Sequence, residues 1–171
     1  MNFARIFTQS LVFFGAGALA LAAAPAFAQK AKDTIRIAIN DPFPTLLQYH
    51  HPADEATNFQ KRVYDELIYL DEYNHKYIPM LAKSWTRVNP TTLEFELRDD
   101  ITFHNGDKFD ADDVKTTIDY VSDPKIPLTF KVRWTWIKSA EVLSPTKIRI
   151  ESFQPNVQDL MTYAMSIPIM D

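Results

Sequence analysis

Apolar and charged residues alternate from Leu93 to Arg98 with the two-residue period of a strand that has one buried and one solvent-exposed face. Asp99-Asp100 interrupts this strand and Ile101-Thr102-Phe103 resumes it. Asn105-Gly106 then favours a type I′ reversal, in which both residues take positive φ angles. Gly106 is the only glycine after position 17, which makes the turn signal strong.

A helix is predicted directly after that turn. Asp110 is a favourable N-cap, and Asp112 and Asp113 place negative charge in the first helical turn, where the helix dipole favours it. Asp123-Pro124 ends the helix. The apolar residues between these limits recur at helical spacing and give the helix one buried face: Ala111, Val114, Ile118 and Val121.

The pattern before residue 93 predicts three further features. Residues 35–39 alternate as a strand, and residues 54–68 place apolar side chains on one face of a helix. Asp71 and Asn74 predict a polar reversal within residues 70–77. Trp85 is expected in the core rather than against a ligand, because a tryptophan packed on a sheet can bury on the order of 200 Å².

The C-terminal third is predicted to form an extended run, a hairpin and a helix. Residues 130–136 alternate aromatic and polar side chains, which indicates a strand with an aromatic face. Two alternating runs flank Ser144-Pro145-Thr146 as a second hairpin. Asn156 caps the last helix and Pro168 stops it, and the apolar face is Val157, Leu160, Met161 and Ala164.

Two groups of residues are candidates for ligand contacts. A polar loop at the end of a sheet strand is a common ligand site in α/β folds, which selects Asn40, Asp41, Pro42, Thr45 and Leu46. The alternative is that the prolines only shape a surface loop. The second group is Trp134 and Trp136, whose rings could grip a ligand or pack in the core.

Metal binding is not favoured by the spacing of the histidines and aspartates. His50 and His51 are adjacent, so on an extended loop their side chains point in opposite directions, and the chain has no cysteine. The aspartates between positions 99 and 113 do not fit a calcium loop and suit turns and caps better. No metal and no other cofactor is predicted.

The first 28 residues have the pattern of a cleaved secretory signal peptide. Arg5 is the only charged residue, an apolar run from Leu11 to Ala24 follows, and Ala26-Phe27-Ala28 fits an A-x-A cleavage site. A membrane anchor is the alternative, but the apolar run is shorter than the roughly 20 residues that span a bilayer. Without a cysteine there can be no lipid anchor and no disulfide, so a periplasmic protein with a hydrophobic core is expected.

The expected mature chain is acidic. Without Arg5 it holds 17 Lys and Arg against 22 Asp and Glu, a net charge of −5. This charge argues against nucleic acid or an anionic membrane surface as partner.

Four pieces between residues 63 and 114 carry a resemblance to a known family. They are Val63-Tyr64-Asp65 with Leu67, the run Pro79 to Trp85, Phe95 with Leu97-Arg98, and Phe103-His104-Asn105-Gly106 leading to Asp113-Val114. In this order they resemble the extracellular solute-binding proteins of peptide-type and nickel-type ABC importers. The resemblance extends over roughly residues 33 to 169.

The resemblance implies a fold, a domain division and partners. The fold would be α/β, with a mixed sheet, flanking helices and hairpins, as in part of the first lobe of a type II periplasmic binding protein. Residues 29–171 would form that partial N-terminal lobe, without the second lobe, and the loop at residues 40–46 would line the cleft. Such a receptor would deliver peptides to ABC permease subunits in the inner membrane, with nickel or another small solute as the alternative.

Two other functions are alternatives to that of a solute receptor. A secreted enzyme is disfavoured because the chain lacks G-x-S-x-G, H-E-x-x-H, a cysteine nucleophile and a glycine-rich phosphate loop, so no catalytic residue is predicted. A secreted interaction module without a small-molecule site fits the hairpin and helix equally well. Only the family resemblance separates the receptor from the module.

We expect signal peptidase to cut after Ala28, because small residues occupy positions 26 and 28 and Pro25 precedes them. Intact-mass analysis of exported protein should give a chain that starts at Gln29. A membrane-bound form that retains Phe27 would show that the leader is an anchor.

Overall fold

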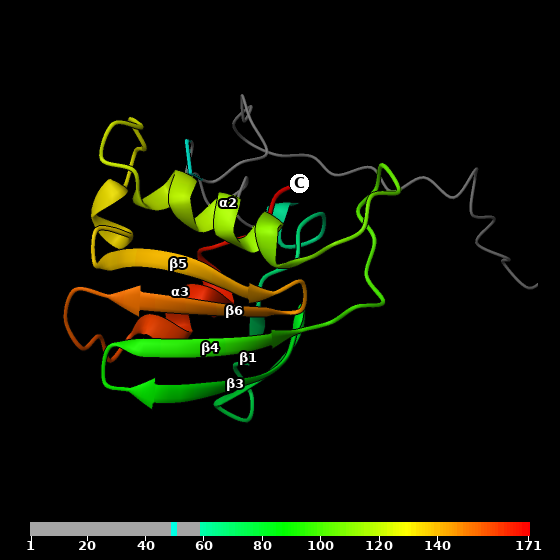
Figure 1. Ribbon diagram of the computed structural model, residues 1–171, viewed down its shortest axis with the longest axis horizontal. Coiled ribbons are helices and arrows are strands. Elements are labelled where there is room, and N and C mark those ends of the chain that lie inside the picture. Colours follow the sequence, from blue (N-terminus) through cyan, green and yellow to red (C-terminus); the bar gives the residue numbers. More distant parts are fainter. Residues whose placement is uncertain (1–48, 51–58) are drawn as a thin grey trace, which may run out of the picture. The chain divides into compact units, whose positions relative to one another are not determined.

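A computed structural model describes residues 49–50 and 59–171 of the chain. Figure 1 shows the elements in their order along the sequence. They are β1 (Ile68–Asp71), β2 (Lys76–Pro79), β3 (Ala82–Asn89), β4 (Thr92–Leu97), α2 (Ala111–Ser122), the 3₁₀ helix η1 (Lys131–Arg133), β5 (Ile137–Ser144), β6 (Lys147–Ser152) and α3 (Asp159–Met165). The signal peptide and the strand predicted at residues 35–39 lie outside the described residues.

The described strands form two antiparallel sheets. The larger sheet has the order β3-β4-β6-β5, and β1 pairs with β2 in a separate hairpin. In the larger sheet Phe95 lies opposite Trp85 of β3 and Ile148 of β6. The predicted α/β class is confirmed, but every strand pair within the described residues is antiparallel, so the expected mixed sheet is not seen in this part of the chain.

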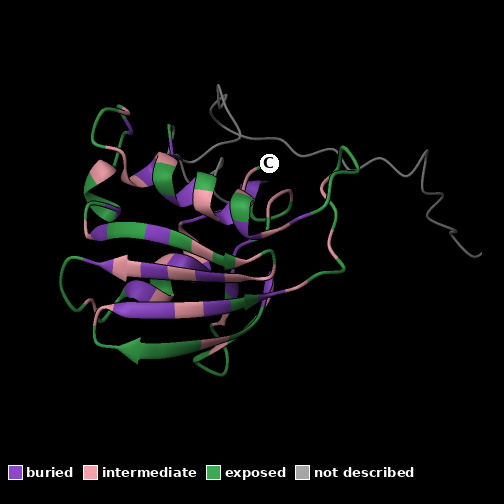
Figure 2. Cartoon of the chain, viewed as in Figure 1, coloured by how far each residue is buried: buried purple, intermediate pink, exposed green. Residues whose placement is uncertain are grey.

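The larger sheet has one apolar and one charged face. Figure 2 shows buried positions alternating with more exposed ones along β4 and β6. Leu93 and Phe95 are buried, whereas Glu94 between them pairs with Arg149 at 2.8 Å and with Lys147 at 3.0 Å. The predicted strand at residues 93–97 is therefore confirmed, with its expected alternation.

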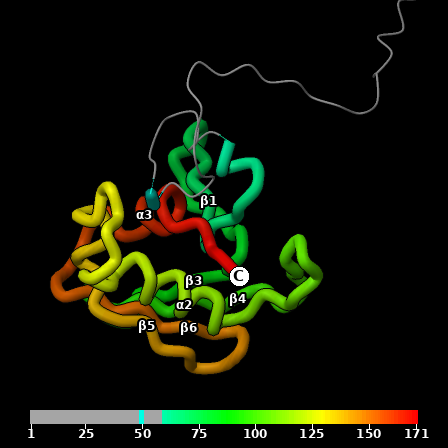
Figure 3. The backbone as a smooth tube through the Cα atoms, turned by 90° about the horizontal axis from the view of Figure 1, so that it is seen from above, coloured from blue at the N-terminus to red at the C-terminus, as the bar shows by residue number. Residues whose placement is uncertain are grey.

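The helices and the C-terminal stretch cover the apolar face. Helix α2 packs on β5 and β6 through the side chains predicted from its spacing, and Asp110 and Asp113 form the capping box at its N-terminus. Helix α3 contacts β1, and Figure 3 shows both on one side of the larger sheet. The buried residues Ile167 and Ile169 follow α3, and the backbone N–H of Ile169 donates to the carbonyl of Asp65 at 3.0 Å.

Short polar side chains close the turns, as the sequence predicts. Asp71 Oδ1 accepts hydrogen bonds from the backbone N–H groups of Tyr73 at 3.1 Å and Asn74 at 3.0 Å. Asn89 Oδ1 accepts from the backbone N–H of Thr91 at 2.9 Å in the turn from β3 to β4. The hairpin predicted around Ser144-Pro145-Thr146 is also confirmed, because β5 pairs with β6.

The predicted type I′ turn at Asn105-Gly106 is wrong. Only Gly106 has a positive φ there, +97°, and Asn105 does not. The Gly106 backbone N–H donates to the Phe103 carbonyl at 3.0 Å, and Asn105 Oδ1 accepts from the backbone N–H of Asp107 at 2.9 Å. Since the asparagine side chain closes the turn, one left-handed residue suffices.

Three predicted elements differ from the observed ones. The helix predicted over 54–68 is helical in its described part only at residues 59–60, and β1 begins at Ile68, where pairing with β2 satisfies the backbone. The run at 130–136 is not a strand but contains η1. The predicted apolar face of α3 is only half right, because Ala164 is buried and Leu160 partly buried, but Val157 is 99% exposed and Met161 45%. Asp159 and Tyr163 are buried in their place.

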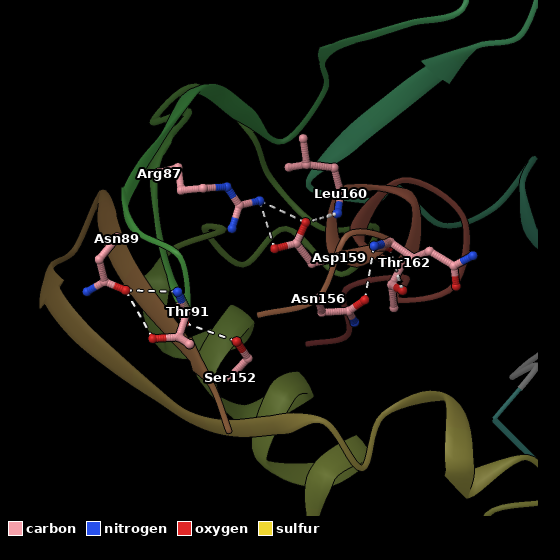
Figure 4. A network of polar contacts seen from close by, with 9 residues as sticks. Arg87, Asn89, Thr91, Ser152, Asn156, Asp159, Leu160 and Thr162 are labelled. Carbon is pink, nitrogen blue, oxygen red and sulfur yellow. Dashed lines mark hydrogen bonds and ion pairs between the residues drawn. The ribbon is translucent and has the colours of Figure 1, made fainter. Parts of the chain in front are cut away.

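An ion pair with a nearly buried aspartate holds α3 to the sheet. Arg87 Nη2 of β3 donates to both carboxylate oxygens of Asp159, at 2.9 and 2.8 Å, and Asp159 is 4% exposed (Figure 4). Asn156 does not cap α3 directly, but its Oδ1 accepts from the backbone N–H of Gln158 at 3.0 Å. The acid at position 159 explains why the apolar spacing misjudged the face of this helix.

Among residues 49–50 and 59–171, no helix combines the length and the apolar character that a membrane crossing requires.

We expect Gly106→Val to lower the free energy of unfolding by about 1 kcal/mol or more, because a β-branched residue is strained at positive φ. The added side chain starts in open space, since a Cβ at position 106 meets no atom within 4 Å, so the effect should come from the backbone alone. Chemical denaturation should show it, with the exposed Lys108→Val as control. Equal midpoints and slopes for both variants would contradict the left-handed turn.

Candidate functional site

Four aromatic side chains from three distant segments meet in a cluster that we call the aromatic junction: Tyr49, His50, Tyr120 and Trp134. The rings of Tyr49 and Trp134 pack edge to face, with centroids 5.3 Å apart and planes at 75°. Tyr49 also contacts Tyr120 at 6.3 Å, and His50 Nε2 lies 2.6 Å from the Tyr120 hydroxyl. The junction therefore joins residues 49–50 to α2 and to the segment after η1.

Hydrogen bonds to backbone groups also fix Tyr49 and His50. The Tyr49 hydroxyl donates to the carbonyl of Pro168 at 2.7 Å, while the Tyr49 carbonyl accepts from the Thr129 backbone N–H at 3.2 Å. The Thr129 hydroxyl donates to the carbonyl of His50 at 2.7 Å. Residues 49–50 are thus bound to two segments that lie about 80 and 120 residues further along the chain.

The first group of predicted ligand residues, Asn40, Asp41, Pro42, Thr45 and Leu46, lies outside the described residues. In sequence this loop ends at Leu46, three residues before Tyr49. The anchored residues 49–50 are therefore the point where the described structure comes nearest to the predicted loop along the chain.

The second group, Trp134 and Trp136, is separated by the fold. Trp134 is 1% exposed and packs on Tyr49, and its indole N–H has no hydrogen-bond partner in the described part of the chain. Trp136 is partly buried, packs on Tyr163 of α3, and borders an open cavity of about 690 Å³. The two rings do not form one aromatic face, and only Trp136 lines this cavity.

A second cavity, of about 570 Å³, lies beside the turn that contains Gly106. It is lined mainly by apolar side chains, among them Ile101, Phe103 and Ile169, with Asp65 and His104 as titratable neighbours. Trp134 and Trp136 do not line this cavity.

The aspartates have the turn and cap roles that the sequence predicts. Asp110 Oδ1 accepts from the backbone N–H of Asp112 at 2.8 Å, and Asp100 pairs with Arg98 at 2.8 Å, which lowers the pKa of the Asp100 carboxyl. Within the described part of the chain, no three His, Asp or Glu side chains gather as a metal-ligand set, and His51 lies outside it.

Glu66 is a buried acid that the sequence analysis did not single out. Its side chain is 7% exposed, and its carboxyl has no hydrogen-bond partner among the described residues. Burial raises its pKa to about 8, and Asp65 adds to this effect while Lys61 opposes it. Burial raises the pKa of the Tyr49 hydroxyl, and the charge of Glu66 adds to this effect. Its position directly before the apolar run Leu67-Ile68 is the only sequence signal for it.

Comparison with known proteins gives a family match and two kinds of relatives. Residues 76–171 match the family described as bacterial extracellular solute-binding proteins, family 5 Middle. The chain is 34% identical over 139 residues to the glutathione-binding protein GsiB of Escherichia coli K12. This match covers 81% of this chain and 26% of that protein. The chain therefore spans about a quarter of the length of the curated relatives that it matches.

Solved structures show the same fold. NikZ from Campylobacter jejuni, in complex with Ni(L-His), is 33% identical, with a TM-score of 0.71 over 82% of this chain and 28% of NikZ. The oligopeptide-binding protein AppA from Bacillus subtilis, in complex with a nonapeptide, has a TM-score of 0.70 over 75% of this chain and 26% of AppA. AppA is 19% identical, so this second likeness concerns the fold alone.

We expect the free energy of unfolding to fall as the pH rises from about 5 to 8. The pKa of the Glu66 carboxyl rises from 4.5, its ordinary value, to about 8 in the folded chain. Its contribution to stability is therefore complete below pH 4.5, decreases as the pH rises, and is lost once the pH has passed about 8. The slope from Glu66 should approach at most about 1.4 kcal/mol per pH unit, the value for one proton.

Glu66→Gln should flatten this slope, because the amide does not titrate. Urea denaturation at several pH values would measure it, with the exposed Glu72→Gln as matched control. A slope that is unchanged in Glu66→Gln would show that another group carries the pH dependence.

Proposed function

The chain belongs to family 5 of the bacterial extracellular solute-binding proteins, and on that premise we propose that it captures peptides for an ABC importer. The family resemblance seen in the sequence is thereby confirmed, and so is the expectation of a binding protein rather than an enzyme. Delivery of the peptide to permease subunits in the inner membrane is part of the proposal.

The relation to the glutathione-binding protein carries the peptide proposal. Glutathione is a tripeptide, and the match runs over 81% of this chain at 34% identity. We propose a ligand of the same class, with a short backbone and free carboxylates, without specifying its side chains.

The aromatic junction supports a binding role for the loop at residues 40–46. The loop ends three residues before Tyr49 in the sequence, and the ring and hydroxyl of Tyr49 are both fixed. Asn40, Asp41 and Thr45 then offer polar groups to a peptide backbone, and Pro42 and Leu46 offer apolar surface. A site held by a rigid support loses less entropy when it binds a ligand.

A nickel complex is the second candidate for the solute. NikZ, in complex with Ni(L-His), is 33% identical to this chain, and His50 is held at the junction with His51 next to it in sequence. Neutral imidazole suits nickel, so a second solute class is open to the same protein.

The proposed location follows from the family and from the leader. Family 5 proteins are extracellular solute-binding proteins, and the predicted cleavage after Ala28 would release the chain into the periplasm without a lipid anchor.

We expect the chain to bind glutathione and other short peptides in preference to the nickel–histidine complex. Ligand-observed NMR suits the test because it detects millimolar affinities. Asp41→Asn should weaken peptide binding severalfold, because it removes a charge that can pair with a peptide ammonium group. Asp99→Asn, at an exposed aspartate that pairs with Lys83, should not.

Two outcomes would contradict the peptide proposal. Binding of the nickel complex without peptide binding would select the second candidate. Absence of both would leave the chain without a solute of either class.

A further inference from the structure

We propose that the cavity beside Trp136 binds the carboxylate end of a small organic solute, a subsite that rests on the proposed solute-binding function. We call it the Arg133 pocket and define it by Lys61, Arg133, Trp136, Asn156 and Met161, which all line it. It lies between η1, the connection from β6 to α3, and α3 itself. Its volume of about 690 Å³ is within the range of small-molecule sites.

The charge of the pocket is the first argument. Arg133 and Lys61 form no ion pair with the described residues, and no aspartate or glutamate is among the residues that line the cavity. The whole chain is acidic, with a net charge of −4, whereas these two cations give this cavity a local positive charge. Such cations favour an anion, and a guanidinium can hold both oxygens of a carboxylate.

The position of Arg133 is partly fixed before any ligand arrives. Its guanidinium carbon lies 4.9 Å from the centroid of the Phe130 ring, a cation–π contact, and its backbone N–H donates to the Phe130 carbonyl at 2.9 Å. A side chain held in this way loses less rotamer entropy on binding than a free arginine does.

The apolar wall is the second argument, because it is fixed as well. The Trp136 indole N–H donates to the Arg133 carbonyl at 2.7 Å, and the ring packs edge to face on Tyr163 with centroids 5.8 Å apart. Met161 of α3 is 45% exposed at the same cavity and offers an adaptable thioether. The pocket therefore suits a solute that carries a carboxylate on an apolar body.

Concavity favours a small solute over a protein partner at this place. Val132, which is 75% exposed, lines the cavity and adds apolar surface to its rim. A protein partner that covers the rim would bind with or without a carboxylate, whereas the proposed solute requires one. A test that varies only the charge of the ligand therefore distinguishes the protein partner from the small solute.

The test titrates the full chain with hydrocinnamate and with hydrocinnamamide, its neutral isostere, by ligand-observed NMR. We expect the carboxylate to bind about tenfold or more tightly than the amide, the usual effect of a charge-assisted hydrogen bond. Arg133→Gln and Lys61→Gln should each reduce this preference. Arg98→Gln is the matched control, because Arg98 pairs with Asp100 away from the pocket.

Equal binding of acid and amide, no binding of the acid, or an unchanged preference in Arg133→Gln would each overturn the proposal. Far-UV circular dichroism of each variant verifies that it is folded, and Lys61→Gln gives a second reading if Arg133→Gln unfolds. The outcome is separable from the peptide test above. Peptide binding without a carboxylate preference rejects the Arg133 pocket alone, whereas the preference without peptide binding rejects the peptide proposal alone.

Discussion

Burial of one face of the four-stranded sheet is the constraint on which the described structure depends. Phe95 lies at the centre of this face, fully buried, between Trp85 and Ile148 on the neighbouring strands. The chain has no cysteine, so no disulfide can replace this packing. Everything that covers the face, including α2, α3 and the stretch from Ile167 to Ile169, is held mainly by the removal of apolar surface from water.

Helix α3 shows how polar contacts add to that packing. Tyr163 packs on Phe95 with ring centroids 5.2 Å apart, and the Arg87–Asp159 pair fixes the start of the helix. A buried ion pair adds little net stability, but loss of one partner leaves an uncompensated charge and costs about 3–5 kcal/mol when burial is complete. Asp159 is nearly buried and Arg87 is not, so the pair mainly determines which face of α3 turns inward. The orientation of α3 in turn places Met161 and Trp136 beside the same cavity.

The aromatic junction likewise combines ring packing with polar contacts, and it joins residues near both ends of the described part of the chain. The Tyr49 ring packs on Trp134 and its hydroxyl donates to the Pro168 carbonyl, while Glu66 is a buried acid whose carboxyl has no hydrogen-bond partner among the described residues. A buried carboxyl that stays protonated at neutral pH lowers stability as the pH rises, and it persists where the surrounding packing is strong enough. The family match gives the class of function, and these contacts fix residues 49–50 against α2 and the C-terminal stretch.

Local signals in the sequence determined several parts of this protein correctly: the strand at 93–97, the capped helix after Asp110, the hairpin around Pro145, and the family motifs themselves. These features depend on side chains a few residues apart, whose spacing can be read directly. The tertiary structure alone decided that residues 68–71 form a strand, since only pairing with β2 distinguishes a short apolar strand from the end of a helix. It also separated Trp134 from Trp136, because η1 replaces the expected strand and turns one ring into the core and the other toward the Arg133 pocket. Periodicity cannot foresee that choice, which depends on Tyr49 and Tyr163, partners that are distant in sequence and meet the two rings only in the folded chain.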